Sequence, residues 1–140
     1  FEFVWSGGAK RVVDGFLYTP WGVNGVEYSG EAFVQRRVFL GEVEEWTIRS
    51  GSLKSQHVFH LHVHHFQIVD TSHENEMDYK IGDWRDTITI PANGYVVIRW
   101  IPDRYEGLSL AHCHLFPHSD TGMVVVYDAA SRRDDDGRRA

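Results

Sequence analysis

The sequence is short of the residues that cross-link or interrupt a fold. Its 140 residues include one cysteine, four prolines and two methionines. A single cysteine excludes an internal disulfide, so the stability of the fold has to come from a packed core. Apolar residues make up 42% of the chain, which suffices at this length for the core of one compact domain.

The lack of a long apolar run and of positive net charge excludes two classes of protein. No apolar run approaches the roughly 18 residues of a membrane span, so we expect no transmembrane helix. The formal net charge of −6 has the wrong sign for a nucleic-acid surface, so we expect no nucleic-acid partner. The chain begins with Phe1 inside an apparent strand, as a fragment or processed product does, and the missing leader therefore carries no information about the compartment.

The patterning predicts an all-β fold, an antiparallel sandwich or barrel. Short apolar or alternating runs are separated by turn signals such as Asn24-Gly25, and no segment has a sustained 3.6-residue period. We expect one domain over residues 1–130 and a charged, disordered tail over residues 131–140. The predicted strands are 1–5, 34–40, 42–49, 57–70, 84–90, 95–101, 108–114 and 123–127.

The chemistry is concentrated around the cysteine. Cys113 lies between His112 and His114, with His118 and Met123 shortly after them. Such a cysteine could be a small buried side chain, a nucleophile or a metal ligand. The histidines favour the metal, because a thiolate, imidazoles and a weak thioether form the ligand set of a blue-copper centre.

A second cluster, His57, His60 and His62, lies some fifty residues earlier. On a strand, residues two apart share a face, so His60 pairs with His62 and His112 pairs with His114, while Cys113 points the other way. His57 is offset by three from His60 and can face the Cys113 side. Zinc is the main rival metal, but zinc sites usually carry Cys-x-x-Cys spacings, which are absent here.

At this point the sequence resembles a known family. It is similar to the C-terminal cupredoxin domain of multicopper oxidases of the laccase and bilirubin-oxidase kind, which implies a cupredoxin-like Greek-key fold. The two copper motifs are specific in combination, and the other segments support them. The segments that carry the resemblance are Val23-Asn24-Gly25-Val26, LGEVEEWTI (40–48), HVFHLHVHHFQIV (57–69), WRDTITIPANGYVVIRW (84–100) and AHCHLFPHSDTGM (111–123).

The resemblance implies a ligand set. His57, Cys113 and His118 would bind a type 1 copper with Met123 as weak axial ligand. His60 would bind the type 2 copper, and His62, His112 and His114 the type 3 pair. Cys113, His112 and His114 are thus the candidate catalytic residues, because they would pass electrons from the type 1 copper to the cluster. Val63 departs from the family, which usually has glycine there.

The resemblance also implies what the rest of the enzyme supplies. The family's trinuclear cluster uses eight histidines, of which this chain offers four. The others would come as two His-x-His pairs from a further cupredoxin domain or subunit. The implied reaction is oxidation of a small, phenol-like reducing substrate coupled to reduction of O2 to water, in a secreted or periplasmic protein.

Two alternatives remain open. A stand-alone type 1 electron carrier would keep only one copper, but it would have no use for His60, His62, His112 and His114. A copper nitrite reductase would not need His114. Among other residues, we expect Asp86 to be buried and hydrogen-bonded, and we expect three tryptophans to lie in the core: Trp46, Trp84 and Trp100.

Overall fold

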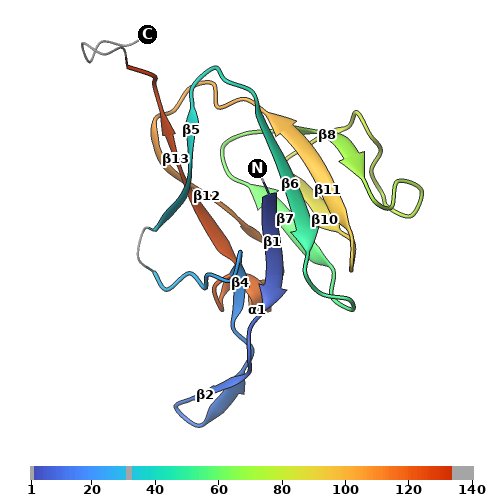
Figure 1. Cartoon of the computed structure of the whole chain (residues 1–140), viewed down its shortest axis with the longest axis vertical. Helices are drawn as coiled ribbons and strands as arrows, with labels where there is room; N and C mark the ends of the chain where they lie inside the picture. The colour runs from blue at the N-terminus through green and yellow to red at the C-terminus, as the bar shows by residue number, and fades with distance from the viewer. Residues whose placement is uncertain (1, 31–32, 134–140) are drawn as a thin grey trace.

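The computed structural model describes residues 2–30 and 33–133, which form a sandwich of two β-sheets (Figure 1). One sheet has the strand order β4-β1-β6-β11-β8-β9, and the other has the order β10-β7-β12-β13-β5. The strands of the first sheet are β1 (Glu2–Gly7), β4 (Trp21–Val23), β6 (Glu44–Ser50), β8 (Phe66–Thr71), β9 (Trp84–Arg85) and β11 (Tyr95–Trp100). Those of the second are β5 (Val34–Phe39), β7 (His57–Leu61), β10 (Thr87–Ile90), β12 (Gly107–Cys113) and β13 (Val124–Ala130).

The sheets are mixed, which reflects a Greek-key connectivity. Strands β1 and β6 pair in parallel, as do β13 and β5, while the other strand pairs are antiparallel. Alternate residues of β6 and β11 point into the sandwich, and the core is filled by aromatic and β-branched side chains. The all-β prediction is therefore confirmed, as is the absence of long helices, since the described chain has a single short helix, α1 (Phe116–Ser119).

The predicted strand over residues 57–70 is wrong as a single element. It divides into β7 and β8, separated by a turn at residues 62–65. Val63 sits in this turn with a φ of 72°, a left-handed conformation that is strained for a β-branched residue. The sequence pattern missed the turn because it contains no glycine or proline.

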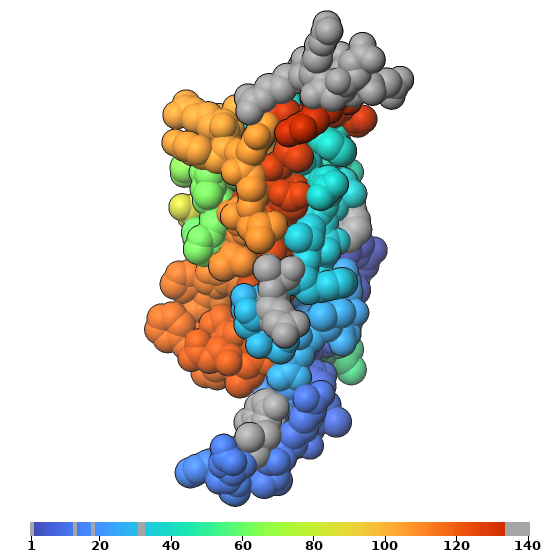
Figure 2. All heavy atoms as spheres, turned by 90° about the vertical axis from the view of Figure 1, so that its left-hand side faces the viewer, coloured from blue at the N-terminus to red at the C-terminus, as the bar shows by residue number. Residues whose placement is uncertain are grey.

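A hairpin that the pattern also missed projects from one end of the molecule. It consists of β2 (Arg11–Val13) and β3 (Phe16–Tyr18), joined at Asp14 and Gly15, both with positive φ. That geometry is typical of a type I′ turn. The hairpin extends beyond β4 and α1 in Figure 1 and stands away from the body in Figure 2.

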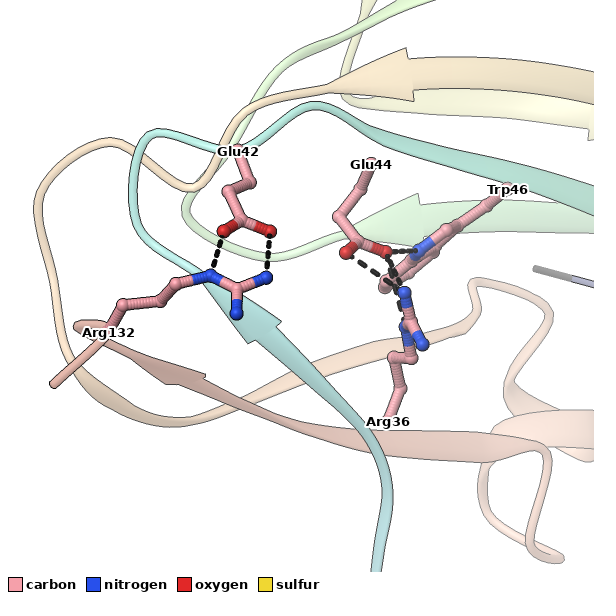
Figure 3. Close-up of polar contacts among 5 residues, drawn as sticks. All are labelled: Arg36, Glu42, Glu44, Trp46 and Arg132. Atoms are coloured by element: carbon pink, nitrogen blue, oxygen red, sulfur yellow. Dashed lines mark hydrogen bonds and ion pairs between the residues drawn. The ribbon is translucent and has the colours of Figure 1, made fainter. Parts of the chain in front are cut away.

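Strand alternation places Glu44 and Trp46 on the same buried face at the start of β6 (Figure 3). The Glu44 carboxylate is buried, accepts two-pronged hydrogen bonds from Arg36 of β5, and accepts a third from Trp46 Nε1 at 2.8 Å. This contact ties the edge of one sheet to the other. Glu42 pairs with Arg132, so residues 131–133 of the predicted tail lie against the domain, while residues 134–140 lie outside the described residues.

Candidate metal centre

Strand pairing brings the two histidine clusters together. In the antiparallel pair β7–β12, His112 lies opposite His60 and Cys113 lies opposite Phe59. Directly opposed residues project to the same face of a sheet, so His60 and His112 share the outer face while Cys113 points into the sandwich. Two groups of donors result, on opposite sides of one strand.

The inner group consists of His57, Cys113 and His118, whose donor atoms all lie within 4.8 Å of one another. His57 Nδ1 is 3.2 Å from His118 Nδ1, and Cys113 Sγ is 3.6 Å from the same His118 atom. His57 and Cys113 are fully buried. Their elements are β7, β12 and α1, and the short helix turns the chain back so that His118 faces Cys113.

Met123 lies beside this group. Its side chain is fully buried, its backbone N–H donates to the carbonyl of His118, and its carbonyl accepts from the N–H of Cys113. These two bonds fix the methionine backbone against both residues. Met123 is therefore a buried residue whose backbone contacts His118 and Cys113, and its role as the weak axial ligand stays a prediction.

Burial disfavours charge on the inner group. It lowers the pKa of His57 from 6.5 to about 4, with repulsion from His118 as the second cause. Burial also lowers the pKa of His118 and raises the pKa of the Cys113 thiol, against opposing backbone hydrogen bonds from Val58 and Leu115. The histidines are therefore neutral at pH 7, the form that ligates metals.

The outer group consists of His60, His62 and His112, with donor atoms again within 4.8 Å of one another. His112 Nε2 is 2.9 Å from His62 Nε2. The exposed His114 stands next to them, with its ring centroid 5.7 Å from those of His60 and His112. Burial lowers the pKa of His62 and of His112, so these two imidazoles are also neutral at pH 7.

Backbone carbonyls fix the tautomers of the outer group. His60 Nδ1–H donates to the carbonyl of Asp86 at 3.0 Å, and His112 Nδ1–H donates to the carbonyl of Cys113 at 2.9 Å. A carbonyl oxygen only accepts, so each Nδ1 carries the proton and each Nε2 presents a lone pair. This orientation by hydrogen bonds from the opposite ring nitrogen is typical of metal-ligating histidines.

The residues present fit metal ions. Nitrogen and sulfur donor atoms of the inner group converge in a buried space, with His57 Nδ1 and Cys113 Sγ both close to His118 Nδ1. One thiolate with two imidazoles and a thioether is the donor set of a blue-copper site. The all-imidazole outer group also suits copper.

Some expectations for other residues are wrong. Asp86 is exposed, and its backbone carbonyl rather than its carboxylate makes the contact with His60. Trp84 is 63% exposed, because β9 is a two-residue edge strand, whereas Trp46 and Trp100 are buried as expected. His64, His65 and His73 lie outside both donor groups.

Sequence reasoning missed one aromatic residue of the site. Trp21 of β4 stacks on the His118 ring, with 3.9 Å between ring centroids and 27° between planes. It also meets the ring of His57 edge-on at 5.5 Å. Nothing in the spacing along the sequence connects Trp21 with α1. The pairing of β4 with β1 and the hydrogen bond from Trp21 N–H to the carbonyl of Thr121 bring it there.

Comparison with known proteins agrees with the fold. The two-sheet sandwich with an inner cysteine–histidine group defines a cupredoxin-like domain. A family model described as multicopper oxidase matches residues 9–133. The chain belongs to the multicopper oxidase family.

Several relatives carry related names. The iron transport multicopper oxidase fio1 of Schizosaccharomyces pombe is 32% identical over 81 residues, covering 51% of this chain and 13% of that protein. Laccase-12 of Arabidopsis thaliana is 35% identical over 82 residues, covering 51% and 14%. Bilirubin oxidase of Albifimbria verrucaria is 26% identical over 117 residues, covering 78% and 20%. The chain thus spans a fifth or less of the length of these relatives.

Solved structures give the same fold. A multicopper oxidase from Campylobacter jejuni, described as a metallo-oxidase, superposes with a TM-score of 0.76 at 22% identity, covering 92% of this chain and 29% of that one. No helix among the described residues is long and apolar enough to cross a membrane.

Proposed function

We propose that this chain is the C-terminal cupredoxin domain, over residues 1–130, of a copper-dependent oxidase that reduces O2 to water. The observation that carries the proposal is the placement of two donor groups on opposite sides of β12. The proposed type 1 ligands are His57, Cys113, His118 and Met123. The proposed ligands of the type 2 and type 3 ions are His60, His62, His112 and His114.

The backbone of β12 joins the two groups. Cys113 belongs to the inner group, its peptide neighbour His112 belongs to the outer group, and its other neighbour His114 stands next to that outer group. Copper, when bound, supplies one-electron redox chemistry at the inner group and the reduction of O2 at the outer group. The protein holds the imidazoles neutral and oriented, through burial at the inner group and through carbonyl hydrogen bonds at the outer group.

The outer group needs a partner. Four histidines supply half of the ligands that a trinuclear cluster of this family uses, and a further cupredoxin domain or subunit would supply two His-x-His pairs. A laccase-like activity toward a small phenol-like substrate is supported by the laccase relative, and a secreted or periplasmic location by the family resemblance. A stand-alone electron carrier is not favoured, because it would leave the four outer histidines without a role.

Copper stoichiometry with a visible spectrum tests the proposal. We expect an intense blue thiolate band that is lost in Cys113→Ser and kept in the matched control His73→Ala, which changes a histidine outside both groups. About four coppers per active unit are expected once the partner domain is present. A blue Cys113→Ser variant would refute the ligand assignment, and a single copper with the partner present would favour the electron carrier.

A further inference from the structure

His62 lies just outside the strand that carries the other histidines of its cluster. β7 ends one residue earlier, and His62 opens the turn at residues 62–65, in which Val63 has a φ of 72°. The outer group nevertheless requires His62 Nε2 to stay close to His112 Nε2, at 2.9 Å. Contact with β12 fixes the N–H side of His62, which donates to the carbonyl of Leu110 at 3.0 Å. The carbonyl side has to be fixed by other contacts.

Tyr127 supplies one of these contacts from two strands away. It belongs to β13, which lies beside β12 (Figure 1), and its side chain is fully buried in the sandwich. The phenol reaches across β12, and its O–H donates to the carbonyl of His62 at 3.0 Å. The same carbonyl accepts from the N–H of His64 at 2.8 Å. Both lone pairs of the His62 carbonyl are therefore used inside the protein.

The side chain of His64 completes this network. Its Nδ1 is 3.2 Å from the Tyr127 hydroxyl oxygen. Because the hydroxyl proton is already donated to the His62 carbonyl, this bond runs from His64 Nδ1–H to the phenol oxygen. The His64 ring is buried and packs against Trp100, with 5.0 Å between ring centroids. Burial raises the pKa of Tyr127, against a hydrogen bond from Ser109, so the phenol stays protonated and remains a donor at neutral pH.

The network opposes any rotation of the peptide that follows His62. Such a rotation would break the bonds from Tyr127 and from the His64 N–H together, and it would leave a buried phenol without its acceptor. An unpaired polar group in the interior is costly, and a fully satisfied buried network makes its surroundings rigid. The turn after β7 is thus held in one arrangement, and with it the direction in which the His62 side chain leaves the backbone.

We propose that Tyr127 and His64 are positioning residues of the outer group, which hold His62 so that its Nε2 meets that of His112. The inference rests on the proposed function, in which His62 is a metal ligand. Both residues act through the backbone of His62 rather than through its ring nitrogens. The support for an outer ligand therefore comes from the core of the sandwich, on the far side of β12.

The metal-free protein tests the positioning directly. The NOE between ring protons of His62 and His112 is measured by NMR, and we expect it to weaken about twofold or more in Tyr127→Phe, which removes only the hydroxyl group. The matched control is Tyr79→Phe, because Tyr79 is also buried and donates its O–H to a backbone carbonyl, that of Thr89, at 2.9 Å. This control loses the same type of bond and should keep the NOE. An unchanged NOE in Tyr127→Phe, or equal weakening in both variants, overturns the proposal.

The part of His64 is tested by a pair of variants. His64→Asn places an amide N–H near the position of Nδ1 and should keep most of the NOE, whereas His64→Leu removes the donor and should weaken the NOE about twofold or more. Both variants lose the packing of the imidazole on Trp100, so their difference reports the hydrogen bond alone. Equal NOEs in the two variants overturn the role of His64, and Tyr127→Phe decides the proposal if His64→Leu does not fold.

Metal affinity is measured next with Zn(II), which undergoes no redox chemistry, by following the ¹⁵N resonances of the individual imidazoles. We expect Tyr127→Phe to weaken zinc binding at the outer group by about tenfold or more, as the loss of a residue that orients a ligand does, and to change binding at the inner group less than about twofold. A general loss of stability would weaken both groups alike. Equal weakening at the two groups, or none at the outer group, overturns the proposal.

The two proposals fail in different ways. If the unaltered protein shows no blue band with copper, the proposed function fails, while the NOE in the metal-free protein still decides whether Tyr127 positions His62. If the blue band is present and Tyr127→Phe keeps the NOE, the proposed function stands and the positioning role is wrong.

Discussion

Replacing Arg36 by methionine is expected to leave the Glu44 carboxylate buried without its cation. Glu44 is 7% exposed in its side chain, and Arg36 is 34% exposed (Figure 3). Exposed ion pairs contribute about 0.2–1 kcal/mol, whereas breaking a buried pair from one side costs about 3–5 kcal/mol. The partial exposure of Arg36 places this pair between those limits, so we expect Arg36→Met to lower the free energy of unfolding by about 2–3 kcal/mol.

The neighbouring residue provides a matched control. Arg37 pairs with Asp128 on the surface, and its side chain is 64% exposed. Arg37→Met is therefore expected to cost less than about 1 kcal/mol. Both variants are compared by urea denaturation of the copper-free protein, with the slope of the transition checked for constancy.

A double variant separates the stranded charge from lost packing. Glu44→Gln keeps an acceptor for Trp46 Nε1, which donates to Glu44 in the native protein, but removes the negative charge. Arg36→Met/Glu44→Gln should thus be more stable than Arg36→Met alone by about 1 kcal/mol or more. The reasoning is refuted if Arg36→Met costs no more than Arg37→Met, or if the second substitution adds to the loss.

Three further predictions concern the site. Val63→Gly should stabilise the protein by about 1 kcal/mol in thermal melts, because it removes the strain of a β-branched residue at a φ of 72° and loses little packing at a side chain that is 59% exposed. Val63→Ile keeps the strain and should give no gain in stability. A glycine variant less stable than the native protein would contradict this. His57 has a folded-state pKa of about 4 against an ordinary 6.5, so the unfolded chain binds the extra proton between these values and the copper-free protein should lose stability as the pH falls from about 6.5 to 4. The loss from this one group should reach about 3 kcal/mol and shrink in His57→Gln; an equal pH slope in that variant would assign the effect to other groups. Met123→Leu should raise the potential of the inner copper in a redox titration, and an unchanged potential would show that Met123 is not axial.

Residue types and strand alternation along the sequence were enough to predict which side chains of the candidate site share a face. A cysteine flanked by two histidines constrains the directions of three side chains through strand alternation alone, and the same holds for His60 relative to His57. The all-β fold followed from short alternating runs and turn residues. These inferences need only neighbouring residues, since the two-residue period of a strand fixes which side chains share a face.

Other features depend on contacts that no local pattern encodes. The break between β7 and β8 occurs at Val63, a residue that favours strands, and the surrounding fold holds it in a left-handed conformation. Asp86 contributes its carbonyl rather than its carboxylate, a choice set by the β7–β10 pairing. Trp84 looked like core but lies on an edge strand, since burial depends on which strands neighbour it.

The sequence by itself determined the donor types, their sharing of faces along each strand and the class of fold, because these follow from composition and from a period of two residues. Only the tertiary structure decided that His60 lies opposite His112, that His57 and His118 meet across Cys113, and that Trp21 covers His118. Each of these contacts joins segments far apart in the chain, and their distances are set by strand order and register rather than by spacing along the sequence.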